Sequence, residues 1–252
     1  MRQADRLGAI LERLSAGGSV SVTEIAADLG VSGATVRRDL HLLEVQRLLA
    51  RTHGGAVAQG VLYELPLRYK GARHQAEKLR IAREAAARVA DGEAIGLTGG
   101  TTTTEVARAL VDRQRLTVVT NALNIASELA VRPNLKLVVT GGVARAESYE
   151  LVGPIAEASL DGINLDIVFL GADGVSAEAG LTTHQEVEAH TNRALIERAR
   201  HLVVVADSSK IGRVAFARIC EVDRVEALIT DEAADPGAVA VLKERGVEVT
   251  TV

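Results

Sequence analysis

The sequence predicts an α/β protein in which an N-terminal winged helix-turn-helix is joined to a larger α/β domain with a mostly parallel sheet. Residues 1–57 carry three helical patterns followed by a hairpin signal around a Gly-Gly pair. From about residue 75, helical stretches alternate with short apolar runs, the pattern of a parallel sheet covered by helices. We therefore expect a small domain over 1–57, a linker over 58–74 and a larger domain over 75–252.

The composition is that of an ordinary soluble globular protein, with 252 residues, of which 47% are hydrophobic and 25% charged. The net charge of -4 means that any basic patch for nucleic acid must be local. The one cysteine, Cys220, excludes an internal disulfide framework and suits a reducing compartment. The N-terminal MRQADRLGAI has no apolar signal-peptide region, and no apolar run approaches the roughly 20 residues of a membrane helix. We expect a cytoplasmic protein.

The N-terminal elements follow one another closely. A first helical stripe stops at Gly17-Gly18, and Ser21 opens a second helix that Gly30 ends. Ser32 can cap a third helix whose apolar residues fall at i, i+4 and i+7. The stretch LLARTHGGAV then gives a strand, a turn and the start of a return strand.

The third helix has a polar face that can enter a major groove, where arginine pairs with guanine or binds phosphate. The hairpin after it would serve as a wing that touches the DNA backbone. Asp39 is expected to orient one of the two neighbouring arginines or to face solvent. The alternative is that Arg37 and Arg38 form only a solvated face of a small helical domain. The candidate DNA-binding residues are Ser32, Thr35, Arg37, Arg38, His41, Arg51 and His53.

Residues 1–57 resemble the DNA-binding domain of the DeoR family of bacterial transcriptional regulators. The resemblance rests on SVSVTEIAADLGVSGATVRRDLHLLE and on LLARTHGGA. One position departs from the family pattern, because Arg47 stands where the family usually has a glycine that ends the helix in the left-handed conformation.

In the larger domain, helices are expected over 77–90, 103–110, 122–130 and 186–199, and strands over AIGL, LTVVT, LKLVVT, DIVFLGA, HLVVVA and EALIT. The stretch GLTGGTTTTEVA reads as strand, glycine turn and helix. Gly99 and Gly100 allow close backbone approach, and Thr101 and Thr102 offer hydroxyl and N–H groups at a helix N-terminus, which favours an anion. The loop is neither a Walker A nor a G-x-G-x-x-G motif. It can equally be a tight turn with a helix cap.

Polar residues also follow the other expected strands. Asn121 follows LTVVT, Arg145 lies shortly after LKLVVT, Asp173 follows DIVFLGA and Lys210 follows HLVVVA. Taken singly these are a helix cap, a turn former and solvated side chains. Their common position at strand ends suits a small phosphorylated polyol. His184 and His190 lie near GLTT, where solvated surface positions are expected, and the six histidines show no metal spacing, so neither metal nor cofactor is expected.

The resemblance to the DeoR family extends through TNALNIASEL, VTGGVARAESYELVGP, FLGADGV, GLTT and ADSSKIGRVAF. The family's sensor domain is similar in fold to ribose-5-phosphate isomerase, glucosamine-6-phosphate deaminase and CoA-transferase proteins, and the resemblance implies a sugar-phosphate effector. Two departures bear on that effector. Thr98-Gly99 stands where the family often has Asp-Ser, so a carboxylate is missing there, and Asn192 replaces a common lysine. The candidate effector-binding residues are Gly99, Gly100, Thr101, Thr102, Asn121, Arg145, Asp173, Glu188 and Lys210.

Three functional hypotheses follow. The first is a non-enzymatic repressor of sugar-metabolism genes that binds operator DNA as a homodimer or homotetramer and responds to a phosphorylated sugar. The second is a sugar-phosphate isomerase or deaminase with an appended DNA-binding domain, in which Asp173, Glu188 and Lys210 supply acid–base chemistry. The third is a DNA-binding scaffold whose sensor domain binds nothing.

Overall fold

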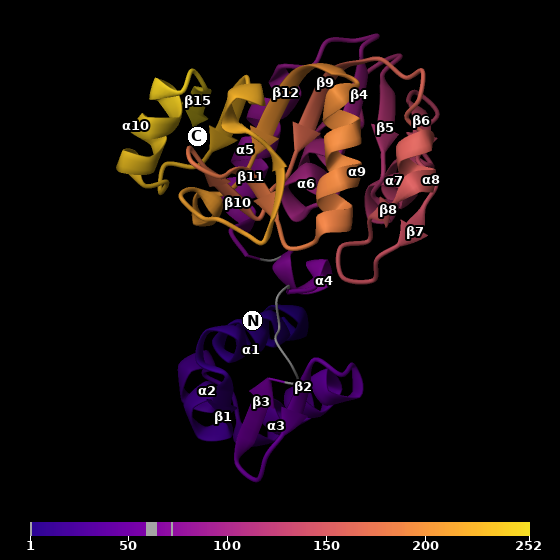
Figure 1. Cartoon of the computed structure of the whole chain (residues 1–252). Coiled ribbons are helices and arrows are strands. Elements are labelled where there is room, and N and C mark those ends of the chain that lie inside the picture. The colour runs from indigo at the N-terminus through magenta and orange to yellow at the C-terminus, as the bar shows by residue number, and fades with distance from the viewer. Residues whose placement is uncertain (1, 59–64, 72) are drawn as a thin grey trace. The chain divides into compact units, whose positions relative to one another are not determined.

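A computed structural model of the chain describes residues 2–58, 65–71 and 73–252. The chain forms two compact units, Met1–Arg73 and His74–Val252, drawn in Figure 1. Among the described residues, no helix is both long and apolar enough to cross a membrane.

The N-terminal unit is a three-helix bundle with a small antiparallel sheet. Its elements are α1 (Gln3–Gly17), β1 (Ser19–Ser21), α2 (Val22–Leu29), α3 (Gly33–Val45), β2 (Leu49–Arg51) and β3 (Gly55–Ala58), with the strands in the order β1-β3-β2. Gly18 and Gly30 end their helices with φ values of 70° and 62°, and Ser21 and Ser32 cap α2 and α3, as the sequence predicts. The strand β1 was not predicted, because three residues are too few for a periodic pattern.

A short helix extends this unit beyond the expected boundary at residue 57. Helix α4 (Leu67–Lys70) lies within the stretch predicted as a linker, and its Tyr69 is buried in the core of the N-terminal unit. A Cβ atom added at Gly8 would lie 2.8 Å from the Tyr69 carbonyl oxygen, so α1 needs a glycine where α4 crosses it. Of the predicted linker over 58–74, Ala58 belongs to β3, and residues 59–64 and 72 lie outside the described residues.

The end of α3 keeps a left-handed geometry although an arginine occupies it. Arg47 has a φ of 58°. Its N–H donates to the Glu44 carbonyl (2.8 Å), and the N–H of Leu48 donates to the Leu43 carbonyl (3.0 Å). These two bonds are the Schellman pattern that glycine normally accompanies. The hydrogen bonds and the buried Leu43 therefore hold a non-glycine residue in a conformation that it disfavours by roughly 1 kcal/mol.

The C-terminal unit is built on a seven-stranded sheet in which every pairing is parallel. The strand order is β15-β14-β12-β9-β4-β5-β6. The strands of this sheet are β4 (Ala94–Leu97), β5 (Thr117–Thr120), β6 (Lys136–Val139), β9 (Leu165–Leu170), β12 (Ala199–Val205), β14 (Ala227–Thr230) and β15 (Glu248–Thr251). The helices are α5 (Gln75–Ala87), α6 (Thr101–Ala109), α7 (Leu123–Leu129), α8 (Pro154–Ala158), α9 (Glu186–Glu197) and α10 (Pro236–Glu244).

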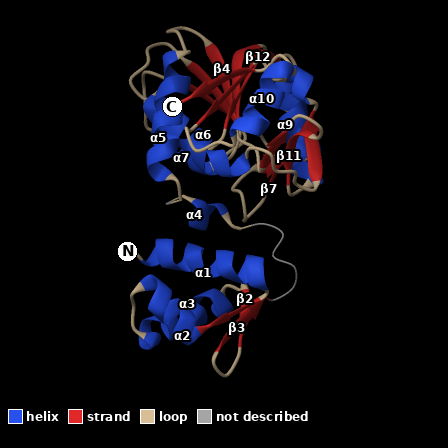
Figure 2. Ribbon diagram, turned by 90° about the vertical axis from the view of Figure 1, so that its left-hand side faces the viewer, coloured by secondary structure: helices blue, strands red, loops and turns tan. Residues whose placement is uncertain are grey.

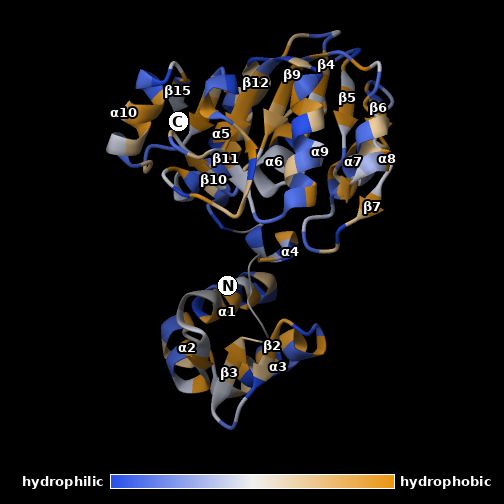
Figure 3. Cartoon of the chain, viewed as in Figure 1, coloured by the Kyte–Doolittle hydropathy of each residue, from blue (hydrophilic) through white to orange (hydrophobic). Residues whose placement is uncertain are grey.

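Helices cover both faces of this sheet, which Figure 2 shows between two helical layers. Alternate residues of one strand point to opposite faces, so Phe169 packs with α5, α6 and α7, whereas Val168 and Leu170 pack with α9 and α10. Burial on both faces explains why these strands read as continuous apolar runs (Figure 3).

The expected strands and helices of this unit are confirmed, with ends that shift by a few residues. Helix α6 starts at Thr101 rather than Thr103. The sequence pattern does not predict β15, α8 or α10. It also does not predict the antiparallel sheet of β10 (Gly174–Ser176), β11 (Gly180–Thr183) and β13 (Ala217–Cys220), or the pair of β7 (Val143–Ala144) and β8 (Leu151–Val152). Most of these missed elements are short, and short elements carry little periodicity.

Replacing Arg47 with glycine is expected to stabilise the protein by about 0.5–1 kcal/mol, because glycine adopts the left-handed conformation without steric cost. Chemical denaturation of the wild type and Arg47→Gly measures the difference. The control is Arg38→Gly within α3, which should destabilise by about 1 kcal/mol. An unchanged or lower stability of Arg47→Gly would mean that the left-handed arginine carries no strain.

Candidate DNA-binding surface and effector site

Helix α3 separates an apolar face from an exposed polar face. Val36, Leu40 and Leu43 are buried in the core of the N-terminal unit. The Ser32 Oγ atom accepts the Thr35 N–H at 3.2 Å and lies 2.9 Å from the Thr35 hydroxyl, which fixes the start of the helix. The side chains predicted to contact DNA from this helix are solvent-exposed, apart from the half-buried Thr35; the exposed ones are Ser32, Arg37, Arg38 and His41.

Asp39 does not face solvent and does not orient a neighbouring arginine, so this expectation is wrong. The side chain is 1% exposed and accepts two hydrogen bonds from Arg6 of α1, at 2.7 and 3.1 Å. Gln3 donates a third, at 3.4 Å. Position 39 falls between the polar and apolar faces of α3, where α1 crosses it. Asp39 therefore fastens α3 to α1.

The wing is tied to α3 through Glu44. The Arg51 side chain donates to a Glu44 carboxylate oxygen at 2.7 Å, and the Arg51 backbone N–H donates to the other at 3.3 Å. These bonds lower the pKa of Glu44. His53 is exposed in the turn between β2 and β3. Among the described residues, Arg37 and Arg38 form no ion pair with an acidic side chain, so the available cations of this surface lie on α3.

In the C-terminal unit, the candidate residues gather where the strand order of the sheet reverses. The chain runs from β4 outward through β5 to β6, then returns to β9 beside β4 and continues outward through β12. Such a switch point leaves a crevice outside the carboxyl ends of the two central strands, and ligands bind there in open α/β sheets. The 98–100 loop follows β4, and Asp173 lies shortly after β9.

The loop after β4 is held in one conformation by its own threonines. Gly100 has a φ of 140°, open only to glycine, and its carbonyl accepts the hydroxyls of Thr103 (3.0 Å) and Thr104 (2.6 Å). Thr101 is half-buried at the first position of α6, where backbone N–H groups have no partner within the helix. The arrangement offers N–H donors and the positive end of a helix dipole to an anion.

Thr98, where the sequence lacks the family's aspartate, is fully buried. Its hydroxyl accepts the N–H of Gly171 at 3.1 Å and lies 3.3 Å from the Gly99 carbonyl. These contacts tie the end of β4 to the end of β9. Thr98 therefore stabilises the loop through a buried hydroxyl and is not exposed in the site.

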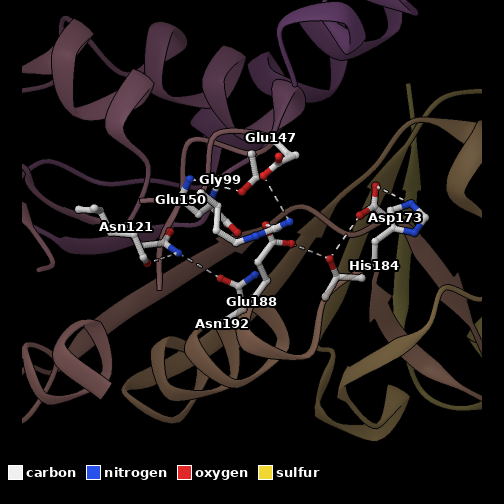
Figure 4. A network of polar contacts seen from close by, with 12 residues as sticks. Gly99, Asn121, Glu147, Glu150, Asp173, His184, Glu188 and Asn192 are labelled. Atoms are coloured by element: carbon white, nitrogen blue, oxygen red, sulfur yellow. Dashed lines mark hydrogen bonds and ion pairs between the residues drawn. The ribbon is translucent and has the colours of Figure 1, made fainter. Parts of the chain in front are cut away.

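A chain of polar contacts links most of the other candidates (Figure 4). Arg145 binds Glu188, whose second carboxylate oxygen lies 3.0 Å from the Thr183 hydroxyl. The same hydroxyl lies 3.3 Å from Asp173. Asp173 in turn lies 3.7 Å from the Lys210 ammonium group and 3.9 Å from the His184 ring. We call this set of residues the strand-end cluster. It comprises Arg145, Asp173, Thr183, His184, Glu188 and Lys210, together with Gly99–Thr102, Asn121, Glu150 and Asn192.

Two members of the strand-end cluster, Glu150 and Asn192, are not among the predicted effector-binding residues. Glu150 is 3% exposed, and its Oε1 atom accepts the Gly99 N–H at 2.8 Å. Burial and the nearby Glu188 charge raise the pKa of Glu150 well above its ordinary value. The sequence feature that could have pointed to Glu150 is its position directly before the apolar pair Leu151-Val152. Asn192 lies 3.5 Å from Asn121, whose own Oδ1 atom is buried without a hydrogen bond from the described residues.

His190 is exposed, as expected, whereas His184 is half-buried at Asp173. Among the described residues, no group of three or more His, Cys, Asp or Glu side chains could hold a metal ion. The cluster is thus a set of hydroxyl, amide, carboxyl and cationic groups beside a helix N-terminus. It can bind a small polar anion through hydrogen bonds and charge.

Comparison with protein families gives two matches in chain order. The DeoR-like helix-turn-helix domain matches residues 6–60, and the DeoR C-terminal sensor domain matches residues 73–232. The chain belongs to the DeoR family.

Relatives within the DeoR family match almost the whole chain. The glycerol-3-phosphate regulon repressor of Escherichia coli K12 is 34% identical over 251 residues, covering 98% of each chain. The transcriptional regulator GlpR of Haloferax volcanii is 36% identical over 250 residues, covering 99% of this chain and 98% of its own. Among solved structures, the full-length sorbitol operon regulator SorC of Klebsiella pneumoniae is 12% identical, with a TM-score of 0.41 over 96% of this chain and 99% of its own.

DeoR-family membership makes the chain a DNA-binding transcriptional regulator. It also decides against the alternative of a sugar-phosphate isomerase or deaminase, since the relatives are named as regulators or repressors. A ribose 5-phosphate isomerase of Methanocaldococcus jannaschii is 26% identical over 54% of each chain, with a TM-score of 0.41.

Replacing Asp39 with asparagine is expected to lower the free energy of unfolding by roughly 2 kcal/mol, because Arg6 would lose its anion. The loss stays below the roughly 3–5 kcal/mol of fully buried pairs because Arg6 keeps some solvent access. Chemical denaturation of the whole chain measures it. The control, Asp28→Asn, breaks an exposed pair with Arg13 and should cost under about 0.5 kcal/mol. Equal effects of the two variants would contradict an anchoring role for Asp39.

Proposed function

We propose that this chain is a cytoplasmic repressor of carbohydrate-metabolism genes whose affinity for operator DNA is controlled by a phosphorylated sugar or polyol bound at the strand-end cluster. Recognition of DNA is assigned to α3 and the β2–β3 wing. Recognition of the effector is assigned to the Gly99–Thr102 loop for the phosphate, and to Asn121, Arg145, Asp173, Glu188 and Lys210 for the rest of the ligand.

The observation that carries the effector half is the start of α6 at the switch point between β4 and β9. The N–H groups of the first helical turn, which have no partner within the helix, and the half-buried Thr101 hydroxyl are donors suited to a phosphate, and Gly100 at φ 140° lets the backbone approach closely. Elsewhere in the strand-end cluster, Lys210 and Arg145 supply positive charge, and the carboxyl and amide groups suit sugar hydroxyls. The name of the glycerol-3-phosphate regulon repressor is consistent with a phosphorylated polyol.

The DNA half is supported by the charge pattern of the N-terminal unit. Arg6 and Arg51 are engaged by Asp39 and Glu44, whereas Arg37 and Arg38 project from the exposed face of α3. The paired arginines fix the positions of α3 and the wing, and the exposed arginines are available to contact DNA phosphates or guanine edges. One winged domain contacts little DNA, so we propose a homodimer or homotetramer that binds two half-sites.

Control requires that the effector bind one arrangement of the chain better than another. A coupling free energy of about 1–3 kcal/mol changes DNA affinity by roughly 5–150-fold. Release of DNA on binding the effector fits a repressor of genes that the effector's presence should switch on.

Replacing Arg38 with alanine is expected to weaken DNA binding by about 1–3 kcal/mol, or roughly 5–150-fold, while leaving effector binding intact. Fluorescence anisotropy with a duplex selected by the purified protein measures the affinity at several salt concentrations. A lost base contact lowers specificity, whereas a lost phosphate contact lowers the salt slope by about one. Arg13→Ala on α1 is the matched control. If Arg38→Ala binds DNA as tightly as the wild type does, the assignment of α3 to the DNA interface is wrong.

Replacing Thr101 with valine is expected to abolish stabilisation by the effector while preserving DNA binding. Thermal unfolding with a panel of aldose, ketose and polyol phosphates measures this, because a ligand at about 100 times its Kd adds about 2.7 kcal/mol to the native state. Thr117→Val, at the other end of the sheet, is the isosteric control. If no compound stabilises the wild type, the proposal that the protein binds a phosphorylated effector is wrong. If Thr101→Val is stabilised as much as the wild type, the phosphate binds elsewhere.

A further inference from the structure

Glu150 occupies the space that a side chain at position 99 would need. A Cβ atom added at Gly99 would lie 2.4 Å from the Glu150 Cγ atom and 2.6 Å from its Oε1 atom. The glycine thus lets a carboxyl group lie directly on the loop backbone, where it accepts the Gly99 N–H at 2.8 Å. Glu150 is fixed by its own backbone as well, since its carbonyl accepts the Arg145 N–H at 2.9 Å and it bridges to Ala122.

The charged groups facing Glu150 come from two elements. Glu188, from α9, is 3% exposed, as Glu150 is, and its charge helps to raise the pKa of Glu150. Arg145, from the β7–β8 segment, binds Glu188 and lies 3.7 Å from the exposed Glu147. Beyond the Thr183 hydroxyl, His184 and Lys210 each lie beside Asp173. Arg145 thus connects the two buried glutamates, because its side chain binds Glu188 and its backbone N–H donates to the Glu150 carbonyl.

Two like charges so close and so buried cannot both be ionised at low cost. Burial and the Glu188 charge raise the pKa of Glu150 well above its ordinary value near 4.5. Arg145 balances the charge of Glu188, whereas the raised pKa of Glu150 favours its proton. Loss of that proton would place an extra carboxylate beside the loop assigned to the phosphate, and the two anions would repel each other.

We propose that Glu150, seated on the Gly99 N–H beside the loop assigned to the phosphate, determines specificity at the effector site, favouring phosphorylated sugars or polyols with a hydroxyl over amino-sugar phosphates with an ammonium group. When Glu150 is protonated, the Arg145–Glu188 ion pair beside it carries no net charge that an ammonium group could balance. The hydrogen-bonding atoms of the protonated carboxyl suit a hydroxyl, which both donates and accepts. This inference rests on the proposed function for its ligand class.

The first test needs no ligand and compares the wild type with the isosteric, neutral Glu150→Gln. A carboxyl whose pKa is raised by folding contributes stability fully below the unfolded value near 4.5, and that contribution is lost as pH rises through the folded value. The free energy of unfolding of the wild type, relative to Glu150→Gln, should therefore fall with pH above about 4.5. Glu147→Gln, in the same segment, is the matched control. A difference that does not change with pH would overturn the protonation of Glu150 and with it the proposal.

The second test uses inorganic phosphate as the probe, with affinity measured by calorimetry on the full chain between pH 6 and pH 9. Phosphate's own ionisation affects both proteins equally. Wild-type affinity should fall relative to Glu150→Gln by up to about tenfold per pH unit once the proton is lost. Identical pH profiles would overturn the proposal while leaving the effector site intact. If neither protein binds phosphate, the proposed function fails instead.

The third test addresses selectivity with D-glucose 6-phosphate and D-glucosamine 6-phosphate, which differ in one group. The wild type should bind the hydroxyl compound more tightly at pH 6, and the preference should shrink as pH rises. In Glu150→Gln the preference should not depend on pH beyond the titration of the amine itself. Equal or tighter binding of the amino sugar by the wild type at pH 6 would overturn the selectivity.

Discussion

The parallel pairing of β4 with β9 is the constraint on which the C-terminal unit depends. Both strands are buried on both faces, so most of their residues are apolar, and the one charged residue, Asp166, lies near the start of β9. The Thr98 hydroxyl joins the two ends by accepting the Gly171 N–H. Everything that follows these strands, from the Gly99–Thr102 loop to Asp173, is thereby brought to one edge of the sheet. The position of the site therefore follows from the order of the strands and not from any single side chain.

In the N-terminal unit, some charged residues hold the structure together and others are exposed for binding. The buried Asp39–Arg6 pair and the Arg51–Glu44 pair fix the positions of α3 and the wing, while the exposed arginines of α3 carry no ion pair among the described residues. Positive charge is thus concentrated locally on a chain whose net charge is -4. A local arrangement of this kind allows a protein without an overall basic surface to meet DNA.

The sequence predicted what depends on periodicity and on local backbone chemistry. The capped helices α2 and α3, the glycine ends at Gly18 and Gly30 and the buried parallel strands all follow from patterns within a few residues. It did not predict what depends on contacts between distant segments. Asp39 and Arg6 are far apart in the chain, as are Glu150 and Gly99, and no local pattern marks either pair. The apparent loss of a carboxylate at Thr98 illustrates the same limit, since a carboxyl group reaches the loop from the β7–β8 segment.

The close approach of Glu150 to Gly99 also restricts how this sequence can diverge. A side chain at position 99 would collide with Glu150, whereas a smaller residue at position 150 would remove the collision and open the position. A side chain at position 99 therefore requires either that the Glu150 carboxyl leave the Gly99 N–H or that position 150 become smaller, so the two positions constrain each other.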